Sequence, residues 1–483
     1  MNIKKGTVID VEIEKLAFGG RGIGRVDLDD TKKKYVVFVE GGIPGDKVKA
    51  SLTKIKKSYG EARLKEVVKP SELRIEPKCK HFGECGGCAL QNISYEDQLK
   101  IKGEQVKESL EKIGGLLDVK VNPVIPCDDP WNYRNKFEYS FDIDKEGKLN
   151  LGFHKKGMRY DLVDLKECYL GPEYVMDLLE RLREGVEKGQ RDFFARKKIP
   201  HKSLYFRIGK NTGEIMINLV VEQDPESSEI EAKIIKQEGE KFLATAQKWT
   251  KDKNLNLVSV YLTQIHRKRG QKTQVKEELL WGNPYLKEKM IVQDSADDIE
   301  LNFQILPQAF FQPNTLQAQK LYKQVLEYAD LKGTENVMDL YCGTGTISLF
   351  LAKKAKRVVG IEVVEDATKS AEENAKLNSI DNIKFLTGPV EKKLKDFMTT
   401  SNTANEHPDL IVVDPPRAGL SPKVVERVCL IHPKKVVYVS CNPTTLARDL
   451  AEFIKSGYKL KEVQPVDMFP HTYHIECVSM LTL

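Results

Sequence analysis

The sequence predicts a multidomain protein with a small amino-terminal β-barrel, an α+β central domain and a carboxyl-terminal, doubly wound α/β domain. Three observations support this fold class. Short alternating strands separated by glycine turns fill residues 1–69, strands with charged loops and helices fill 70–299, and strands alternate with helices over 300–483. The length of 483 residues also suits about three domains of ordinary size.

The amino-terminal region alternates apolar and polar residues, as the strands of a small barrel do. Residues 7–13 and 35–40 show this pattern, and glycine turns lie at 19–22 and 41–46. The stretch that follows is basic and contains Lys54, Lys56, Lys57, Arg63, Lys65 and Lys69. Such a charged run is either a solvated face or a nucleic-acid surface. Because a small barrel that is also basic is typical of oligonucleotide binding, we expect residues 1–69 to bind RNA.

Residues 70–299 are expected to form the central domain, which a proline-bounded linker at 70–77 introduces. The expected elements are strands at 204–208 and 257–262 and charged helices at 172–195 and 222–253. Basic and aromatic residues interleave at 131–137 and 153–156. That mixture suits base stacking together with phosphate contacts. An ordinary half-buried sheet with charged edges explains the same pattern equally well.

The carboxyl-terminal region has the regular rhythm of a doubly wound α/β domain. The expected elements are strands at 337–341, 357–362, 410–414 and 435–441 and helices at 346–355, 366–377, 422–430 and 444–454. In such a sheet the carboxyl ends of the parallel strands form one edge, and ligands bind there. Polar residues at these strand ends are therefore the candidate site.

A glycine turn follows the first of these strands. Asp339 ends the apolar run, Gly343 and Gly345 allow the backbone to approach a ligand, and Glu362 ends the next strand 23 residues after Asp339. An acid at that position suits the hydroxyl pair of a ribose, which NAD and S-adenosylmethionine both carry. The third glycine of the dinucleotide pattern is missing, and an Asp-Pro-Pro run starts at Asp414. Both features favour S-adenosylmethionine.

A cysteine and an acid at strand ends, with a second acid near the carboxyl terminus, predict chemistry on a pyrimidine. Cys441 follows the apolar strand 436–440, Asp414 follows 410–413, and Glu476 lies close to the carboxyl terminus. A lone cysteine at a strand end is more often an inert buried thiol. Between Asp414 and Glu476, however, a thiolate could add to carbon 6 of uracil, so that carbon 5 attacks a methyl sulfonium. A base, for which Glu476 is the candidate, must then remove the carbon 5 proton.

Three further cysteines form a local cluster with the spacing Cys-x5-Cys-x2-Cys. They are Cys79, Cys85 and Cys88, and Cys168 is the candidate for a fourth ligand. Four thiolates suit either zinc or an iron–sulfur cluster. The remaining cysteines are expected to be structural: Cys127, Cys342, Cys429 and Cys477.

Composition narrows the function classes further. The net charge of +6 and the pI near 8.6 are a weak indication of a polyanionic partner. No apolar run approaches the ~18 residues of a membrane span, and the first residues lack the pattern of a signal peptide. We therefore expect a cytoplasmic protein that does not enter membranes.

With these motifs in order along nearly the whole chain, the sequence resembles the RNA uracil-5-methyltransferase family, most closely the branch that acts on 23S ribosomal RNA. Residues 1–69 resemble a TRAM domain, which is an OB-like barrel, and residues 300–483 resemble an S-adenosylmethionine-dependent methyltransferase domain. The resemblance implies a 4Fe–4S cluster on Cys79, Cys85, Cys88 and Cys168. It also implies that the helix near 95–115 packs on the catalytic domain.

The resemblance assigns roles to individual residues. Gln312, Tyr341, Glu362 and Asp414 fall on cofactor-binding positions, Cys441 on the nucleophile and Glu476 on the base. Phe310 matches an aromatic residue that packs near the target base. Arg417 is expected, from its charge alone, to favour the thiolate of Cys441. Residues 388–391 do not match the adenine contact of some members, and the charged stretch 222–253 enlarges the central domain.

Three other functions fit part of the pattern. The first is a transfer-RNA uracil-5-methyltransferase with the same chemistry. The second is an NAD-dependent oxidoreductase with an iron–sulfur centre, which the missing glycine and the Cys441/Glu476 pair disfavour. The third is an RNA-binding assembly factor with a vestigial site, which the complete catalytic set disfavours. We expect a monomer that acts on 23S rRNA, and the sequence does not identify the uridine.

Overall fold

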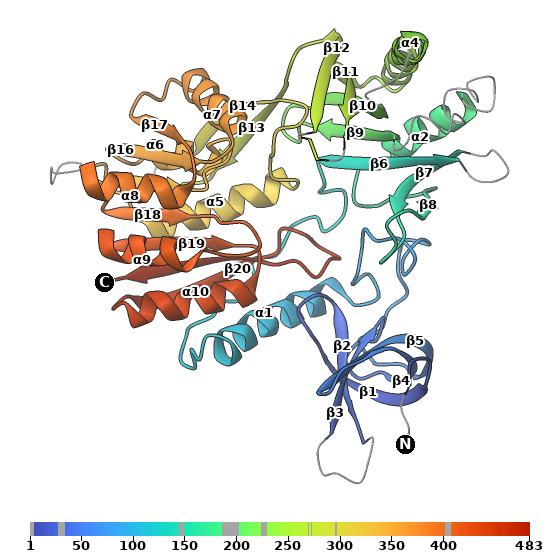
Figure 1. The fold of residues 1–483 in the computed structure, drawn as a ribbon, viewed down its shortest axis with the longest axis horizontal. Helices are drawn as coiled ribbons and strands as arrows, with labels where there is room; N and C mark the ends of the chain where they lie inside the picture. Colours follow the sequence, from blue (N-terminus) through green and yellow to red (C-terminus); the bar gives the residue numbers. More distant parts are fainter. Residues whose placement is uncertain are drawn as a thin grey trace.

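The computed structural model describes residues 4–483 apart from 28–33, 144–148, 186–201, 224–228, 269, 272, 295–296 and 401–406. Figure 1 shows three parts: the α/β domain in orange and red, the central sheet in green, and the barrel in blue beneath that sheet. Within the described residues, no helix combines the length and apolar character needed to cross a membrane.

The predicted barrel is confirmed. Its strands are β1 (Val8–Leu16), β2 (Arg21–Val26), β3 (Tyr35–Glu40), β4 (Lys47–Ile55) and β5 (Tyr59–Lys69). They close in the order β1-β2-β3-β5-β4, so no strand edge remains open. The alternation seen in the sequence places Ile9, Val11 and Ile13 inside the barrel.

The central part is built on a seven-stranded sheet with the order β12-β11-β10-β9-β6-β7-β8. Its strands are β6 (Lys136–Ile143), β7 (Leu149–His154), β8 (Leu162–Asp164), β9 (Lys202–Ile208), β10 (Glu214–Gln223), β11 (Asn256–His266) and β12 (Gln274–Gly282). Helices α2 (Tyr174–Gly185) and α4 (Glu229–Asp252) pack with one another and with this sheet. The hairpin of β13 (Leu286–Val292) and β14 (Ile299–Ile305) leads into the α/β domain.

Two central-domain helix predictions need correction at their starts. The helix expected from residue 222 begins only at Glu229, because Glu222 and Gln223 continue β10, which is paired on both sides. Residues 224–228 lie outside the described part. The helix expected over 172–195 is described as Tyr174–Gly185, and 186–195 also lies outside the described part.

The carboxyl-terminal part confirms the predicted alternation. A seven-stranded sheet has the order β17-β16-β15-β18-β19-β21-β20. Its strands are β15 (Asn336–Leu340), β16 (Arg357–Glu362), β17 (Ile383–Thr387), β18 (Leu410–Val413), β19 (Lys435–Ser440), β20 (Lys459–Val466) and β21 (Glu476–Thr482). The helices are α5 (Thr315–Ala329), α6 (Thr346–Ala352), α7 (Glu365–Leu377), α8 (Val390–Thr400), α9 (Pro422–Ile431) and α10 (Pro443–Lys455). The helix expected over 346–355 therefore ends three residues early, because Lys353 caps it.

Strands β15 to β19 run parallel, whereas β21 inserts antiparallel between β19 and β20. This reversal brings the start of β21 to the same edge as the carboxyl ends of β18 and β19. The polar residues that end these strands therefore meet at one edge of the sheet.

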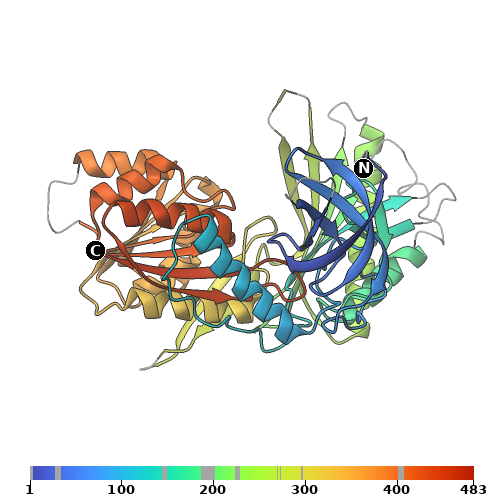
Figure 2. The same cartoon turned by 90° about the horizontal axis from the view of Figure 1, so that it is seen from below.

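Helix α1 (Tyr95–Lys112) precedes the central sheet in sequence but lies along the α/β domain, where it packs against α10. Figure 2 shows it passing in front of the red strands and running towards the barrel. Its buried side chains Val106 and Leu110 share a core with Leu446 and Leu450. The helix thus connects the barrel segment to the α/β domain.

Candidate active site

A cavity of about 1910 Å³ extends from the strand-end edge of the α/β sheet towards the barrel. Its wall includes residues of the barrel turn (Gly19, Gly20 and Arg21), of the cysteine segment (Gly86 to Ala89), of the central part (Arg134 and 153–157) and of the α/β domain. Small-molecule pockets typically measure about 300–1,000 Å³. The cavity is therefore large enough for a small molecule together with part of a macromolecule.

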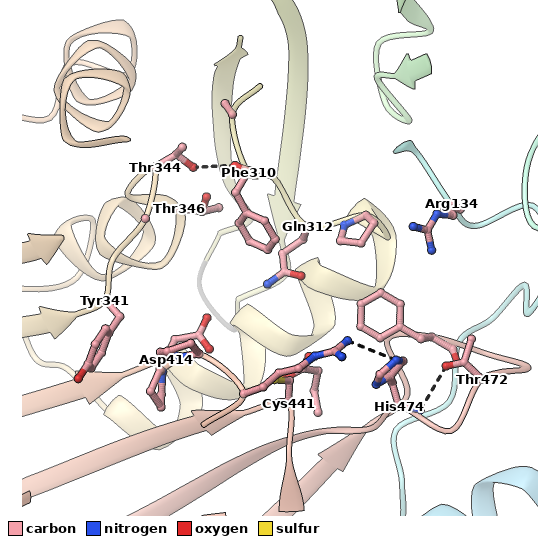
Figure 3. Close-up of a pocket in the computed structure, with 18 of the residues that line it drawn as sticks. Arg134, Phe310, Gln312, Tyr341, Thr344, Thr346, Asp414, Cys441, Thr472 and His474 are labelled. Carbon is pink, nitrogen blue, oxygen red and sulfur yellow. Dashed lines mark hydrogen bonds between the residues drawn. The ribbon is translucent and has the colours of Figure 1, made fainter. Parts of the chain in front are cut away.

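Apart from the four cysteines proposed as metal ligands, eight residues were predicted for the site, and all of them line this cavity. They are Phe310, Gln312, Tyr341, Glu362, Asp414, Arg417, Cys441 and Glu476. Cys441 directly follows β19, Asp414 directly follows β18, and Glu476 opens β21. Figure 3 shows Cys441 and Asp414 at the strand ends, with Phe310 and Gln312 across the cavity from them.

The thiol of Cys441 lies in a desolvated setting beside two acidic side chains. Burial raises its pKa to about 12, and the carboxylates of Glu476 and Asp414 act in the same direction. The guanidinium of Arg417 lowers it, as the sequence predicted, but its effect is smaller than that of burial. The thiol is therefore protonated at neutral pH.

The two carboxyl groups beside Cys441 also bind protons more tightly than usual. Burial raises the pKa of Asp414 to about 7. The pKa of Glu476 is well above its ordinary value, because of burial and then because of the charge of Asp414. Glu476 is 6% exposed. Because two like charges in one buried site oppose each other's ionisation, the pair retains protons near neutral pH.

His474 was not predicted from the sequence, yet it lines the cavity beside Arg417. Its Nε2 lies 3.4 Å from an Nη2 of Arg417, and its ring contacts Phe469 edge to face at 5.9 Å. Burial, followed by the Arg417 charge, lowers the pKa of His474 to about 4. The imidazole is therefore neutral and can accept a hydrogen bond from the guanidinium. In the sequence, only its position two residues before Glu476 could have indicated that His474 belongs to the site.

The glycine turn after β15 is built around Glu362. The backbone N–H of Gly343 donates to its Oε2 at 3.1 Å, and those of Val363 and Val364 donate to its Oε1 at 2.7 and 2.9 Å. Tyr341 has a left-handed backbone with φ of 66°, which is unusual for a non-glycine residue and is commonest at functional sites. Tyr341 and Glu362 thus line the cavity from a tightly defined turn.

The loop between β14 and α5 supplies the opposite wall. Phe310 is 65% exposed, and its carbonyl accepts a hydrogen bond from Thr344 Oγ1 at 3.4 Å. Asn135 of the central part fixes the same loop: its N–H donates to Pro313 O and its Nδ2 to Gln312 O, each at 2.8 Å. An exposed phenylalanine on an anchored loop is suited to stacking on a base.

The four candidate metal ligands surround a second, much smaller cavity of about 20 Å³. Cys79, Cys85 and Cys88 come from one segment and Cys168 from another. Burial raises the pKa of all four thiols, to about 12 for Cys88 and about 11 for Cys168, and neighbouring thiols add to the shift at Cys85, Cys88 and Cys168. No three His, Cys, Asp or Glu side chains within the described ranges are arranged to hold a metal ion.

The expected iron–sulfur cluster is therefore not shown by the structure. A desolvated set of thiols is nevertheless a donor set that fits a thiolate-bound cluster, because metal binding removes the thiol protons. The fit concerns the chemistry of the four side chains and their meeting at one cavity, not a coordination geometry.

Comparisons with known proteins match the chain over its length. Residues 235–483 match the family described as "tRNA (Uracil-5-)-methyltransferase", and residues 3–65 match the TRAM domain. An "Uncharacterized RNA methyltransferase" of Clostridium tetani is 38% identical over 490 residues, covering 99% of this chain and 97% of the relative. A protein of the same description from Halalkalibacterium halodurans is 38% identical over 485 residues, covering 100% and 98%.

One solved structure matches almost end to end. It is the tRNA (uracil-54, C5)-methyltransferase of Pyrococcus abyssi in complex with S-adenosyl-L-homocysteine. The TM-score is 0.70 at 27% sequence identity, and the match covers 98% of this chain and 99% of that one.

Proposed function

Because the chain belongs to the RNA uracil-5-methyltransferase family with a TRAM domain, we propose that it methylates carbon 5 of a specific uridine in 23S ribosomal RNA. The methyl group comes from S-adenosylmethionine, and the uracil is bound covalently to Cys441 during the reaction. The single observation that carries the proposal is the meeting of Cys441, Asp414 and Glu476 at the edge of one cavity. We further infer that the protein acts as a monomer in the cytoplasm.

Transfer RNA is the second candidate substrate, and a specific observation favours it. The Pyrococcus abyssi protein that matches over 98% of this chain is, by its title, a tRNA enzyme. Because that match includes the barrel region, the barrel alone does not argue for ribosomal RNA. The 23S proposal rests on the joint resemblance of the barrel and the four cysteines to the ribosomal branch.

Cys441 is proposed as the nucleophile. Its thiolate adds to carbon 6 of the uracil, which makes carbon 5 an enolate carbon able to attack the methyl sulfonium. The pKa of about 12 means that the thiolate must be favoured during substrate binding. Arg417, whose charge lowers this pKa, supports that step, and His474 supports Arg417 by accepting its hydrogen bond.

Glu476 is proposed as the base that removes the carbon 5 proton, after which the thiolate leaves carbon 6 and the enzyme is released. A buried carboxylate with a raised pKa is a stronger base once ionised than an exposed one. Burial, and then the nearby charge of Asp414, keeps the pKa of Glu476 high. The two acids therefore have different roles, in which Asp414 binds the cofactor and Glu476 transfers the proton.

The cofactor-binding residues are proposed to be Gln312, Tyr341, Glu362 and Asp414, and Phe310 is proposed to stack near the target base. S-adenosylmethionine supplies the electrophilic methyl group when bound. The carboxylate of Glu362, which three backbone N–H groups orient, suits a ribose hydroxyl pair. A base must leave its stack to reach Cys441, at a cost of about a few kcal/mol.

Cys79, Cys85, Cys88 and Cys168 are proposed to hold a 4Fe–4S cluster. Methylation is redox-neutral, so the cluster would shape the segment on which it sits. That segment contacts the loop between β20 and β21, which leads to Glu476. The N–H groups of Ala89 and Leu90 donate to His471 O in this loop at 2.8 and 3.0 Å.

The test is a methyl-transfer assay with labelled S-adenosylmethionine and with unmodified 23S rRNA and unmodified tRNA as separate acceptors. Nucleoside analysis should find 5-methyluridine in the ribosomal RNA, and mapping of the modified nucleoside should then locate it. Label in tRNA alone would retain the mechanism and reject the ribosomal substrate. Absence of label from both acceptors, with intact iron content, would reject the proposed function.

A further inference from the structure

Three cations gather at the start of the central sheet, and none of them has an acidic partner among the residues that the structure describes. Lys136 of β6 stands directly opposite Arg207 of β9 in the antiparallel register, and Arg134 is close enough to donate from Nε to Lys136 O at 2.7 Å. Like charges directly opposite each other on one sheet face are destabilising. Across the described ranges of the chain, no carboxylate forms an ion pair with any of these three side chains.

Because this cluster is buried, the lack of a counter-charge costs more free energy than it would at the surface. Arg207 is 4% exposed, and its buried Nε has no hydrogen-bond partner among the described residues. Desolvation lowers the pKa of Arg207 to about 10 and that of Lys136 to about 8, where the Arg207 charge adds to the effect. A buried cation normally has a paired anion, because burying an uncompensated charge is strongly unfavourable.

The neighbouring acid does not supply that counter-charge. The charge of Glu138 raises the pKa of Lys136. The side chain of Glu138 is exposed, however, and its Oε1 accepts a hydrogen bond from the Tyr205 hydroxyl at 3.0 Å. Tyr205 also offers its ring to the Lys136 ammonium, which lies 5.7 Å from the ring centroid. A cation–π contact of this kind supplies no negative charge to neutralise the ammonium group. The cluster therefore retains unused capacity to bind an anion.

The cluster is attached to the wall of the catalytic cavity. Arg207 Nη2 donates to Ala309 O, and Asn135, which lies between Arg134 and Lys136, holds the carbonyls of Gln312 and Pro313. Arg134 and Ala309 both line the cavity. Figure 3 shows Arg134 on the side of the cavity opposite Tyr341, with Gln312 and Phe310 between them.

We propose that Arg134, Lys136 and Arg207 form a phosphate site that binds the RNA backbone next to the flipped target nucleotide. The inference rests on the proposed function, because it takes the ligand to be the methylated RNA. A phosphate held there would lie beside the loop that carries Phe310, so the neighbouring base could extend into the cavity. The site would thus fix the position of the strand, whatever its sequence.

The test compares Lys136→Gln with Lys136→Arg, which keeps the charge, and with Lys395→Gln, which removes an exposed lysine on α8. Binding to unmodified 23S rRNA and tRNA transcripts is measured over a range of salt concentrations without S-adenosylmethionine. We expect Lys136→Gln to weaken binding about tenfold and to reduce the slope of log K against log salt by about one. Lys136→Arg and Lys395→Gln should bind like the wild type.

A second readout separates a phosphate site from a structural role. Removal of an uncompensated cation relieves repulsion from Arg207, so RNA-free Lys136→Gln should have a higher Tm than the wild type. Wild-type affinity and salt slope in Lys136→Gln would overturn the proposal. So would an increased KM for S-adenosylmethionine with unchanged RNA binding, which would assign the cations to the methionine carboxylate. Failure of the wild type to methylate would reject the proposed function only, because RNA binding is measured independently.

Discussion

The ammonium group of Lys102 lies 2.7 Å from Oδ1 of Asp467, and neither side chain is exposed to solvent. Lys102 also donates to Phe469 O at 3.2 Å. One turn earlier on α1, Gln98 accepts from the His471 N–H at 3.0 Å. These contacts join α1 to the loop that leads into β21, at whose start Glu476 lies. The position of the proposed base therefore depends on a helix from the amino-terminal part of the chain.

Replacing Lys102 by Met should lower the free energy of unfolding by about 3–5 kcal/mol, because it leaves the Asp467 charge buried without a partner. Lys102→Met combined with Asp467→Leu should recover most of the loss. Lys455→Met, which breaks an exposed pair with Glu452, should cost about 0–1 kcal/mol. Urea titration measures all three, and equal losses for Lys102→Met and Lys455→Met would contradict the interpretation.

Alkylation should show the protonated state of the Cys441 thiol. Because its pKa is about 12, the rate of reaction with iodoacetamide should rise with pH throughout the range from about 6 to 10 without a plateau. Arg417→Gln should slow the reaction at each pH, because it removes the charge that lowers this pKa. Cys441→Ala gives the background from other cysteines. A plateau near neutral pH would show an already ionised thiol.

Glu476→Gln should accumulate a covalent protein–RNA adduct, because the methylated intermediate cannot lose its carbon 5 proton. Because the raised pKa of Glu476 keeps this group protonated near neutral pH, the substitution should not by itself change the rate at which Cys441 adds to the uracil. Denaturing gels with labelled RNA measure the adduct, and Glu476→Gln with Cys441→Ala is the matched control. An inactive Glu476→Gln protein without an adduct would exclude Glu476 as this base.

Asp339 should make stability depend on pH. Burial raises its folded-state pKa from 3.8 to about 7, so the folded state binds more protons than the unfolded chain between these values. The stability from this group is present at low pH and is lost as pH rises towards and through 7. The free energy of unfolding of Asp339→Asn, measured relative to that of the wild type, should therefore increase by a few kcal/mol as the pH rises from 5 to 8. A constant difference across this range would contradict the shift.

If Cys79, Cys85, Cys88 and Cys168 hold the proposed 4Fe–4S cluster, protein purified without oxygen should contain about four iron and four sulfide ions per chain. Cys88→Ser should lose both, whereas Cys429→Ser, on α9 of the α/β domain, should keep them. Elemental analysis and the visible absorption spectrum measure the content. Zinc in place of iron would reject the cluster and retain a four-thiolate site.

The sequence predicted the strand-end residues well because each follows a continuous apolar run. Cys441 and Asp414 end strands that are buried on both faces, so the pattern stops where the polar residue begins. The insertion of β21 between β19 and β20 leaves no such signature in the sequence. Only the family motif therefore suggested where Glu476 would lie.

Features that depend on distant partners were missed. His474 acquires its role from Arg417, which lies 57 residues away. Arg207 becomes unusual only because the pairing of β6 and β9 places Lys136 opposite it. The charged stretch from residue 222 has helical composition, but the pairing of β10 with two strands determines the structure of Glu222 and Gln223.

The path of α1 has a consequence for the synthesis of the chain. Lys102 and Asp467 are 365 residues apart, so the barrel and the cysteine segment leave the ribosome long before their partner loop does. Contacts of such sequence separation form late, because closing a long loop costs entropy before it gains stability. A nascent chain can thus expose its folded barrel before the site at the edge of the α/β sheet exists, because that site needs Asp467 and the β21 strand that follows it.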